Sequence, residues 1–254
     1  MVNIAVVGCS GKMGYYVVEA ITNRNDCKVL FGIDLYVNNN YDFNVYKSFD
    51  ETNEIPDVII DFSKPSSLDG MLTFAKNNSV PCVICTTGYS KEQVAQIKEA
   101  SDKIAVFYSG NMSLGINLLI ELAKEASKVI GNQFDIEIIE KHHNLKVDAP
   151  SGTALMIADG ISETLEKEPQ YVYDRHSYRK KRSENEIGIH SVRGGSIVGE
   201  HEVIFAGHDE VVTISHQAQS KEVFAVGAAN AAVFLSEQKP GMYDMGDLLA
   251  SKMN

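Results

Sequence analysis

Short apolar runs alternate with helix-patterned segments through the first half of the chain. The apolar runs lie at 4–7, 28–33, 57–61, 80–85 and 104–108. The segments among them that space apolar residues as a helix does lie at 13–24, 66–77 and 91–101. Strands that are apolar along their whole length and alternate with helices are typical of a parallel sheet covered on both faces. This half of the chain therefore predicts an α/β fold.

The pattern changes after about residue 111. Residues 114–130 predict one long amphipathic helix, whereas 134–138 alternate apolar and polar side chains as a half-buried strand does. A second helix is predicted over 152–165 and a last one over 221–235. Further strand-like pieces lie at 187–193, 201–205 and 211–216. A mainly β sheet with two helices is a different architecture, so we expect a domain boundary near residue 112.

Composition and charge narrow the classes of function. The chain has 254 residues, of which 44% are hydrophobic and 22% charged, and this is ordinary for a globular protein of one large or two modest domains. Its 23 Lys and Arg against 34 Asp and Glu give a net charge of −11. That charge argues against nucleic acid or an anionic membrane as a partner. An anionic ligand would need a local cluster of cations or a helix N-terminus.

The apolar runs and the cysteines are both consistent with a cytoplasmic location. No apolar run approaches the roughly 18 to 20 residues of a membrane helix. The first residues lack a basic stretch and run straight into a predicted strand, so we expect no secretory signal. Four cysteines in a chain of this length do not suggest a disulfide framework. A cytoplasmic protein is predicted.

A glycine-rich turn follows the first predicted strand and opens the first helix. Gly8, Gly11 and Gly14 stand in the spacing G-x-x-G-x-x-G, a variant of the dinucleotide fingerprint G-x-G-x-x-G. Glycines let the backbone approach a pyrophosphate, and the helix N-terminus supplies amide donors. Asp34 ends the second strand, where an acidic residue accepts the ribose hydroxyls of NAD. A generic turn at the glycines and a simple turn cap at Asp34 are the alternatives.

Polar residues also follow two later strands. Thr86, Thr87 and Gly88 come after the strand at 80–85, and residues 109–112 (Ser-Gly-Asn-Met) come after the strand at 104–108. Ligands of open parallel sheets bind at the carboxyl ends of the strands, so these turns are candidates for cofactor contacts. Cys82 and Cys85 form C-x-x-C inside an apolar strand. We interpret them as buried or cofactor-adjacent thiols, not as a redox or zinc pair.

The run from Glu140 to Ala154, E-K-H-H-N-L-K-V-D-A-P-S-G-T-A, is the richest in chemistry. It joins His142, His143 and Lys146 to a predicted helix N-terminus at 151–153. Amides and a lysine there would bind a carboxylate, and His142 and Lys146 are able to supply a proton. Surface histidines and an ordinary helix cap are the alternative. No metal is expected, because neighbouring residues point apart and no third soft ligand stands at metal spacing.

A polar stretch at 166–185 is harder to interpret. Its cations include Arg175, Arg179, Lys180, Lys181 and Arg182. Charged runs of this kind are usually solvated surface loops. A mobile basic loop near an anionic site is the functional alternative, and the sequence leaves both open.

Taken together, these motifs closely resemble the 4-hydroxy-tetrahydrodipicolinate reductase (dihydrodipicolinate reductase) family. The resemblance rests on the glycine turn, the His-His-to-Ser-Gly-Thr run and Thr86–Gly88. It also includes Arg193-Gly194-Gly195, Gly199-Glu200-His201 and the ending Gly241-Met242-Tyr243-Asp244-Met245. It covers essentially the whole chain in order.

The resemblance implies that NADH or NADPH reduces a cyclic imine with two carboxylates, in lysine and diaminopimelate biosynthesis. It implies a Rossmann domain of residues 1–112 and 222–254. It also implies a central α+β domain of residues 113–221, with an open mixed sheet, that binds substrate and forms a homotetramer. The cofactor residues it implies are Gly8, Cys9, Ser10, Gly11, Lys12, Met13, Asp34, Cys85, Thr86, Thr87, Ser109, Gly110, Asn111 and Met112. The substrate residues are His143, Lys146, Ser151, Gly152 and Thr153, with His142 as proton donor or acceptor and Lys146 as proton donor.

Two positions depart from the family pattern. Cys85 stands where a glycine often precedes Thr-Thr-Gly, which changes the packing near the nicotinamide. Leu35 follows Asp34 where some members carry an arginine for a 2′-phosphate. We therefore expect NADH to be preferred over NADPH. Another two-domain dehydrogenase of aspartate-derived metabolites, aspartate- or homoserine-dehydrogenase-like, is the rival enzyme, and a nucleotide-sensing module is the rival without catalysis.

Overall fold

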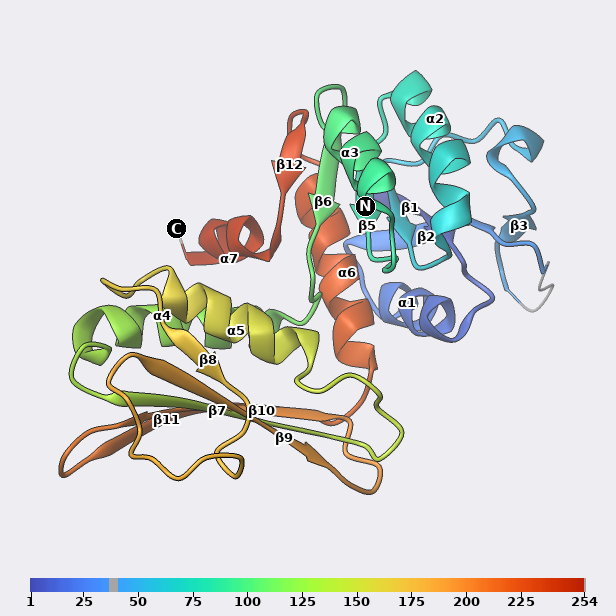
Figure 1. The fold of residues 1–254 in the computed structure, drawn as a ribbon. Helices are drawn as coiled ribbons and strands as arrows, with labels where there is room; N and C mark the ends of the chain where they lie inside the picture. The colour runs from blue at the N-terminus through green and yellow to red at the C-terminus, as the bar shows by residue number, and fades with distance from the viewer. Residues whose placement is uncertain (37–40, 254) are drawn as a thin grey trace. The chain divides into compact units, whose positions relative to one another are not determined.

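The structure, a computed structural model, describes residues 1–36 and 41–253 (Figure 1). The chain divides into two compact units, one of Met1–Ser113 with Glu222–Asn254 and one of Leu114–Lys221. The second unit begins two residues after the position expected from the change in pattern. Each unit is built on one sheet, seven-stranded in the first and five-stranded in the second.

The first unit is a doubly wound α/β fold. Its strands are parallel and lie in the order β12-β6-β5-β4-β1-β2-β3. The strands are β1 (Val2–Val7), β2 (Cys27–Ile33), β3 (Asn44–Tyr46), β4 (Val58–Asp61), β5 (Cys82–Ile84), β6 (Ala105–Tyr108) and β12 (Gly241–Tyr243). The helices are α1 (Lys12–Thr22), α2 (Leu68–Asn78), α3 (Lys91–Ala100), α6 (Glu222–Leu235) and α7 (Met245–Met253), with short turns of 3-10 helix at Phe49–Glu51 and Pro65–Ser67. The strand order reverses direction at β1, which makes the carboxyl end of β1 the switch point where such sheets bind ligands.

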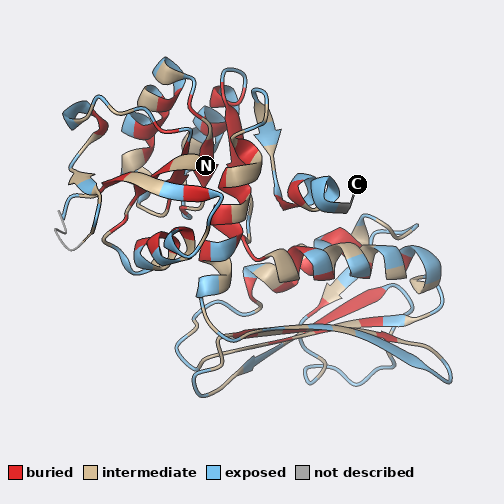
Figure 2. Ribbon diagram, turned by 180° about the vertical axis from the view of Figure 1, so that it is seen from behind, coloured by how far each residue is buried: buried red, intermediate tan, exposed pale blue. Residues whose placement is uncertain are grey.

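Helices cover both faces of this sheet, because its strands carry apolar side chains on both faces. Alternate residues of one face, such as Ala5 and Ile59, pack with α2 and α3, and α1 and α6 lie against the other face. The central strands β4 and β5 are consequently buried along their whole length, whereas the edge strands β3 and β12 are not. Figure 2 shows the buried residues in red. The predicted parallel sheet is confirmed. The C-terminal segment returns to this unit, where β12 pairs with β6.

The second unit is a mixed sheet with two helices on one face. Its strands lie in the order β11-β10-β7-β9-β8, with β10 antiparallel to β7 and β11 and with β9 parallel to β7 and β8. The strands are β7 (Asp135–His142), β8 (Gln170–Val172), β9 (Glu186–Arg193), β10 (Gly199–Ala206) and β11 (Val211–Ala218). The helices are α4 (Leu114–Ile130) and α5 (Gly152–Ser162). The predicted open mixed sheet is confirmed.

Period-two patterning decides which face of this sheet is buried. Ile136 and Ile138 of β7 and Val203 and Phe205 of β10 are buried in the core with residues of α4 and α5. The intervening residues, among them Glu137, point to the opposite face. Near the carboxyl end of β7, Glu140 and His142 occupy the positions that continue the buried face of Ile136 and Ile138. The candidate site begins at these two polar side chains.

Four short elements were not predicted from the sequence. The strands β3, β8 and β12 have three residues each, too few to show a period. Strand β8 lies inside the polar stretch 166–185, which is therefore not entirely a loop. Helix α7 follows the final motif. Among the described residues, no helix is both long and apolar enough to cross a membrane.

Candidate active site

The glycine turn of the first unit is shaped by close approaches of the backbone. Gly8 has φ +81°, and a Cβ on it would lie 2.5 Å from the carbonyl oxygen of Phe62. A Cβ on Gly14 would lie 2.0 Å from the carbonyl oxygen of Gly8. No side chain caps α1 at Gly11. The turn thus presents backbone to a ligand at a helix N-terminus, which is the arrangement that fits a pyrophosphate.

Asp34 joins the loop after β2 to the glycine turn. One carboxylate oxygen accepts a hydrogen bond from the Ser10 amide at 3.0 Å, and the other accepts from the Tyr36 amide at 3.1 Å. The capping role that the sequence left open is therefore present. Each oxygen has a second acceptor direction, so the carboxylate can still receive ribose hydroxyls. Leu35 beside it is 74% exposed.

A buried carboxyl group links the turns after β4 and β5, and the sequence analysis missed it. Asp61 ends β4 and accepts hydrogen bonds from the Ser63 amide at 3.0 Å and the Tyr89 hydroxyl at 3.0 Å. The Ser63 amide also donates to the Thr86 hydroxyl at 2.9 Å. Burial raises the pKa of Asp61, and the hydrogen bonds oppose that rise. An acid at the end of a wholly apolar strand was the available signal.

The remaining cofactor candidates lie at the ends of β5 and β6. The Ser109 hydroxyl donates to the Asn111 carbonyl at 3.1 Å, and Met112 is buried. Cys82 and Cys85 are free cysteines. Burial raises the pKa of both thiols, so neither is prepared for nucleophilic or redox chemistry. All these turns stand at the carboxyl edge of the parallel sheet.

In the second unit, His142 is the last residue of β7 and is only 11% exposed. Its Nδ1 lies 2.6 Å from Oε2 of Glu140, and its backbone carbonyl accepts a hydrogen bond from the Gly194 amide at 2.9 Å. The ring packs closely on Gly199, since a Cβ there would lie only 3.2 Å from Nε2. The ring is therefore held by Glu140 at Nδ1, which leaves Nε2 as its available nitrogen.

His143 and Lys146 lie in the turn that follows β7. The Lys146 amide donates to the His143 carbonyl at 3.1 Å, which closes the turn. The Lys146 ammonium lies 2.9 Å from Oδ1 of Asp148, and this ion pair lowers the pKa of that carboxyl group. Nδ1 of His143 is buried and has no hydrogen-bond partner in the described part of the chain. The turn thus holds one cation and one unsatisfied imidazole nitrogen.

The N-terminus of α5 is tied to the same strand. Ser151 caps the helix, with its hydroxyl accepting from the Ala154 amide at 3.1 Å, and its own amide donates to Glu140 at 3.1 Å. The Ser151 hydroxyl also lies 3.1 Å from Nε2 of His201. Gly152 is exposed at the first position of the helix. The predicted substrate residues are therefore brought together around the end of β7.

His201 completes this cluster and was found from the sequence only as part of a motif. It pairs with Glu140 across β7 and β10, and its ring meets that of His142 edge to face at 5.3 Å between centroids. Burial, together with nearby His142, lowers the pKa of His201 to about 4. His201 is therefore a neutral imidazole at physiological pH. The available signal was alternation along the strand, because His201 stands two residues before Val203 and four before Phe205 and so shares their face.

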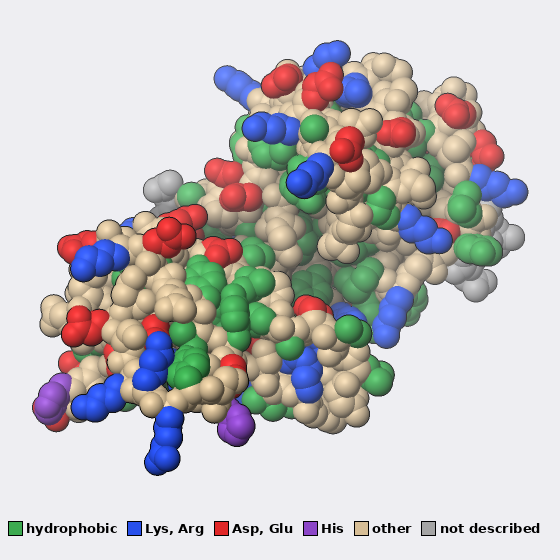
Figure 3. Space-filling model, viewed as in Figure 1, with side chains coloured by type: hydrophobic (Ala, Val, Ile, Leu, Met, Phe, Trp, Pro, Cys, Tyr) green, Lys and Arg blue, Asp and Glu red, His purple; other side chains and the backbone are tan. Residues whose placement is uncertain are grey.

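The polar stretch 166–185 is bound to the face of the sheet opposite the helices. Arg175 donates to Oε1 of Glu137 at 2.7 Å, and Arg182 donates to the same oxygen at 3.0 Å and to Asp135 at 2.8 Å. Two of its cations are thus neutralised by carboxylates of β7. On the face drawn in Figure 3, acidic and basic side chains are interspersed.

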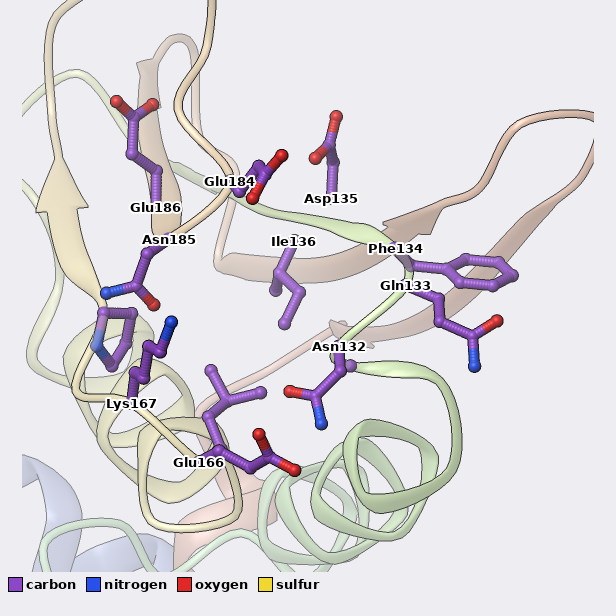
Figure 4. Close-up of a pocket in the computed structure, with 13 residues that line it drawn as sticks. Asn132, Gln133, Phe134, Asp135, Ile136, Glu166, Lys167, Glu184, Asn185 and Glu186 are labelled. Atoms are coloured by element: carbon purple, nitrogen blue, oxygen red, sulfur yellow. The ribbon is translucent and has the colours of Figure 1, made fainter.

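A pocket of about 410 Å³ lies at the other end of β7 (Figure 4). Asn132, Asp135, Lys167 and Glu184 are among the residues that line it. None of the predicted site residues belongs to this lining, because Asp135 begins the strand that His142 ends. Within the described residues, no three His, Cys, Asp or Glu side chains are grouped to hold a metal ion.

Comparison with protein families gives two matches that together cover most of the chain. The model described as "Dihydrodipicolinate reductase, N-terminus" matches residues 2–112. The model described as "Dihydrodipicolinate reductase, C-terminus" matches residues 115–249.

Similar proteins carry the same description. The 4-hydroxy-tetrahydrodipicolinate reductase of Caldanaerobacter subterraneus subsp. tengcongensis is 52% identical over 98% of this chain and 98% of its own length. That of Clostridium tetani is 47% identical over 99% of this chain and 98% of its own. A solved dipicolinate-bound dihydrodipicolinate reductase from Paenisporosarcina sp. TG-14 has a TM-score of 0.80 and 25% identity, covering 96% of this chain and 97% of that one. A myo-inositol dehydrogenase from Corynebacterium glutamicum, at TM-score 0.61 and 15% identity over 99% of this chain and 93% of that one, shares the fold.

Proposed function

This chain belongs to the dihydrodipicolinate reductase family, and from that premise we propose which of its residues carry the reaction. It is a nicotinamide-dependent 4-hydroxy-tetrahydrodipicolinate reductase of lysine and diaminopimelate biosynthesis. The bound cofactor supplies a hydride, and the protein must hold the ring and deliver a proton. The observation that carries the assignment is His142 at the end of β7, whose Nδ1 is held by Glu140, the same carboxylate that accepts from the Ser151 amide at the N-terminus of α5.

We assign cofactor binding to the first unit. The uncapped start of α1 and the two crowded glycines, Gly8 and Gly14, fit a pyrophosphate that approaches the backbone closely. Asp34 stands at the end of β2, where the adenosine ribose binds in this type of sheet. The turns after β5 and β6 stand at the same edge and would complete the site.

We assign substrate binding to the second unit. The substrate is a small cyclic dicarboxylate, and its carboxylates need compensation in a chain of net charge −11. Lys146 supplies a cation, and His143 supplies a buried ring nitrogen that has no hydrogen-bond partner among the described residues. The amides of Gly152 and Thr153 lie at the N-terminus of α5, a helix of 11 residues, whose dipole is positive at that end. Dipicolinate is bound in the solved relative from Paenisporosarcina.

We assign proton delivery to His142 and Lys146. When a hydride forms a new C–H bond on the unsaturated ring, the π electron pair it displaces accumulates on the ring. A proton must then be added, and a positioned acid does this more effectively than water. His142 Nε2 is the ring nitrogen that Glu140 leaves available, because Glu140 holds Nδ1. Lys146 stabilises the developing negative charge.

Dipicolinate binding tests the substrate assignment without turnover. We expect His143→Ala and Lys146→Ala each to raise the Kd for dipicolinate at least tenfold, because each removes a group that compensates a carboxylate. A loss of tenfold corresponds to about 1.4 kcal/mol, within reach of one charged contact. Isothermal titration calorimetry gives the Kd. Lys141→Ala is the matched control, since Lys141 pairs with Glu200 through a bond on the opposite face of the sheet. Equal losses in all three variants would contradict the assignment.

We expect the enzyme to prefer NADH over NADPH by about tenfold or more in kcat/KM. The carboxylate of Asp34 can accept the 2′- and 3′-hydroxyls of NADH, but it repels the 2′-phosphate of NADPH. Leu35 offers no compensating charge. A tenfold preference requires a difference of roughly 1.4 kcal/mol, and the repulsion between the Asp34 carboxylate and a 2′-phosphate is large enough to supply it. Steady-state kinetics with both cofactors measure the ratio.

The double variant Asp34→Ala with Leu35→Arg should shift this ratio towards NADPH. Lys12 lies in the glycine turn and is exposed, so it is the cation that could instead reach the 2′-phosphate. An equal or better kcat/KM with NADPH in the unmodified enzyme would show that Lys12, or another group, compensates the phosphate.

We also propose a homotetramer, assembled through the second unit. The face of its sheet opposite α4 and α5 carries no helix in the described part of the chain, and its edge strands β8 and β11 are open to pairing. Light scattering at assay concentration should give four times the chain mass of 27.9 kDa. A fully active monomer would contradict this proposal. The four free cysteines suit the reducing cytoplasm, which we propose as its location.

A further inference from the structure

We propose that Glu140 is the positioning residue that keeps the proton of His142 on Nδ1, so that Nε2 is the nitrogen that exchanges a proton with the substrate. The inference rests on the role proposed above for His142. It adds a residue that itself touches neither substrate nor cofactor and acts through the imidazole.

The geometry of β7 places the two side chains together. Glu140 and His142 are two residues apart on one strand, so both project from the face covered by α4 and α5. Oε2 of Glu140 lies 2.6 Å from Nδ1 of His142. Glu140 is fully buried, at 0% exposure. A contact this short between a buried carboxylate and a ring nitrogen indicates a charge-assisted hydrogen bond.

Arg193 ensures that Glu140 is a carboxylate. Its guanidinium donates to Oε1 at 2.7 Å and to Oε2 at 2.8 Å, and it is itself held by the Asp148 carbonyl at 2.6 Å. Burial raises the pKa of Glu140, but the hydrogen bonds from Arg193, Ser191 and His142 outweigh burial and bring that pKa to about 2. An ionised carboxylate can only accept, so Nδ1 of His142 must carry the hydrogen.

The other groups around the ring do not compete for this arrangement. His201 of β10 is neutral and engages Ser151 through Nε2. Lys146, in the turn after β7, directs its ammonium to Asp148. Gly199 of β10 keeps the space beside Nε2 free of a side chain. Among the described residues, these groups and Arg193 of β9 are the titratable and charged neighbours whose contacts surround the His142 and Glu140 pair.

Replacing the carboxylate by an amide should reverse the tautomer. The amide nitrogen of a glutamine at 140 can donate to Nδ1, which moves the ring hydrogen to Nε2, and the amide cannot stabilise an imidazolium. In a serine protease triad, the equivalent change from aspartate to asparagine lowers kcat by about 10⁴. Glu140→Gln should therefore weaken the acid while leaving the groups that bind the carboxylates in place.

The expected result for Glu140→Gln is a fall in kcat of about 10²- to 10³-fold, with KM and the Kd for dipicolinate changed by less than about threefold. Glu140→Asp, which keeps the charge one methylene further away, should recover part of kcat.

Glu137→Gln is the matched control. Glu137 lies on the same strand and is held in a similar way, by Arg175, Arg182 and a histidine, His190, whose Nε2 is 2.7 Å from Oε2. It projects from the opposite face of the sheet. We expect the kcat of Glu137→Gln to stay within about twofold of that of the unmodified enzyme, once light scattering confirms an unchanged assembly.

The outcomes separate this inference from the function on which it rests. If His142→Gln loses activity but Glu140→Gln keeps kcat, the inference is wrong and the function stands. If His142→Gln itself keeps kcat, the proposed function fails. Should Glu140→Gln not fold, ¹⁵N spectra of histidine-labelled unmodified enzyme decide, with the His142 signal identified by its loss in His142→Gln. A neutral ring protonated at Nδ1 supports the inference, and one protonated at Nε2 overturns it.

Discussion

Replacing His142 by Gln should lower kcat by about 10²- to 10⁴-fold, which is the usual contribution of a positioned acid. His142 is the side chain whose ring is held at Nδ1 by a buried carboxylate, which leaves its second nitrogen available. Lys146→Ala should cause a loss of similar size, because it removes the second group to which we assign proton delivery. Steady-state kinetics with NADH and freshly generated substrate give kcat, and circular dichroism checks that each variant is folded.

Two controls sharpen this expectation. His143→Ala should mainly raise KM, since it removes binding that substrate and transition state share. His208→Gln, at a histidine 94% exposed in the turn before β11, should change neither constant. A double variant at His142 and Lys146 that turns over at nearly the rate of the unmodified enzyme would refute the catalytic assignment.

Gly14→Ala should impair both cofactor binding and folding. The added Cβ would lie 2.0 Å from the Gly8 carbonyl oxygen and 2.7 Å from Cα of Cys9, so backbone would have to move at the point where α1 meets the glycine turn. Overpacking of this kind costs about 1 to 3 kcal/mol or more. A cost of about 2 kcal/mol is equivalent to a 30-fold rise in the Kd for NADH. Cofactor titration and thermal unfolding measure the two effects.

Gly70→Ala provides the matched comparison. Gly70 and Gly14 are each the third residue of a helix of 11 residues, but a Cβ on Gly70 meets nothing within 4 Å. Helix propensity alone predicts that both substitutions stabilise the protein by about 0.5 to 1 kcal/mol. Only the packing at Gly14 reverses the sign. A Gly14→Ala enzyme that binds NADH as tightly as Gly70→Ala would contradict the account of the glycine turn.

Much of the fold followed from patterns that are local in the sequence. Wholly apolar runs predicted the buried parallel strands, and strict alternation at 134–138 predicted β7. The short strands β3 and β8 could not be predicted in this way, because they are defined by pairing with a neighbouring strand. Parallel pairing joins residues far apart in the chain, and a single sequence carries little signal for it.

The candidate site shows the same division. His142, His143, Lys146 and the start of α5 belong to one run, so the sequence could place them together. The support of His142 could not be predicted, because Arg193 is 53 residues from Glu140, and strand pairing brings them together. Asp34 was left with two roles, and the structure shows its capping bonds directly.

The rival functions differ from this account in what the second unit would do. A nucleotide sensor needs only the first unit, and an enzyme for other aspartate-derived metabolites has no use for His-His-x-x-Lys before Ser-Gly-Thr. The family matches cover both units and exclude both rivals. The stretch 166–185 had a mobile basic loop near an anionic site as its functional alternative. Arg175 and Arg182 are bound to Glu137, so these two cations do not fit that alternative.

The most direct test of the central claim is the oxidation of NADH by the purified protein with freshly generated 4-hydroxy-tetrahydrodipicolinate, followed at 340 nm, a wavelength at which NADH absorbs. The account predicts substrate-dependent turnover that dipicolinate inhibits and that is lost, by at least about 100-fold in kcat, in folded His142→Gln. Turnover that persists in His142→Gln, or that dipicolinate does not affect, would contradict the claim that the end of β7 is the active site.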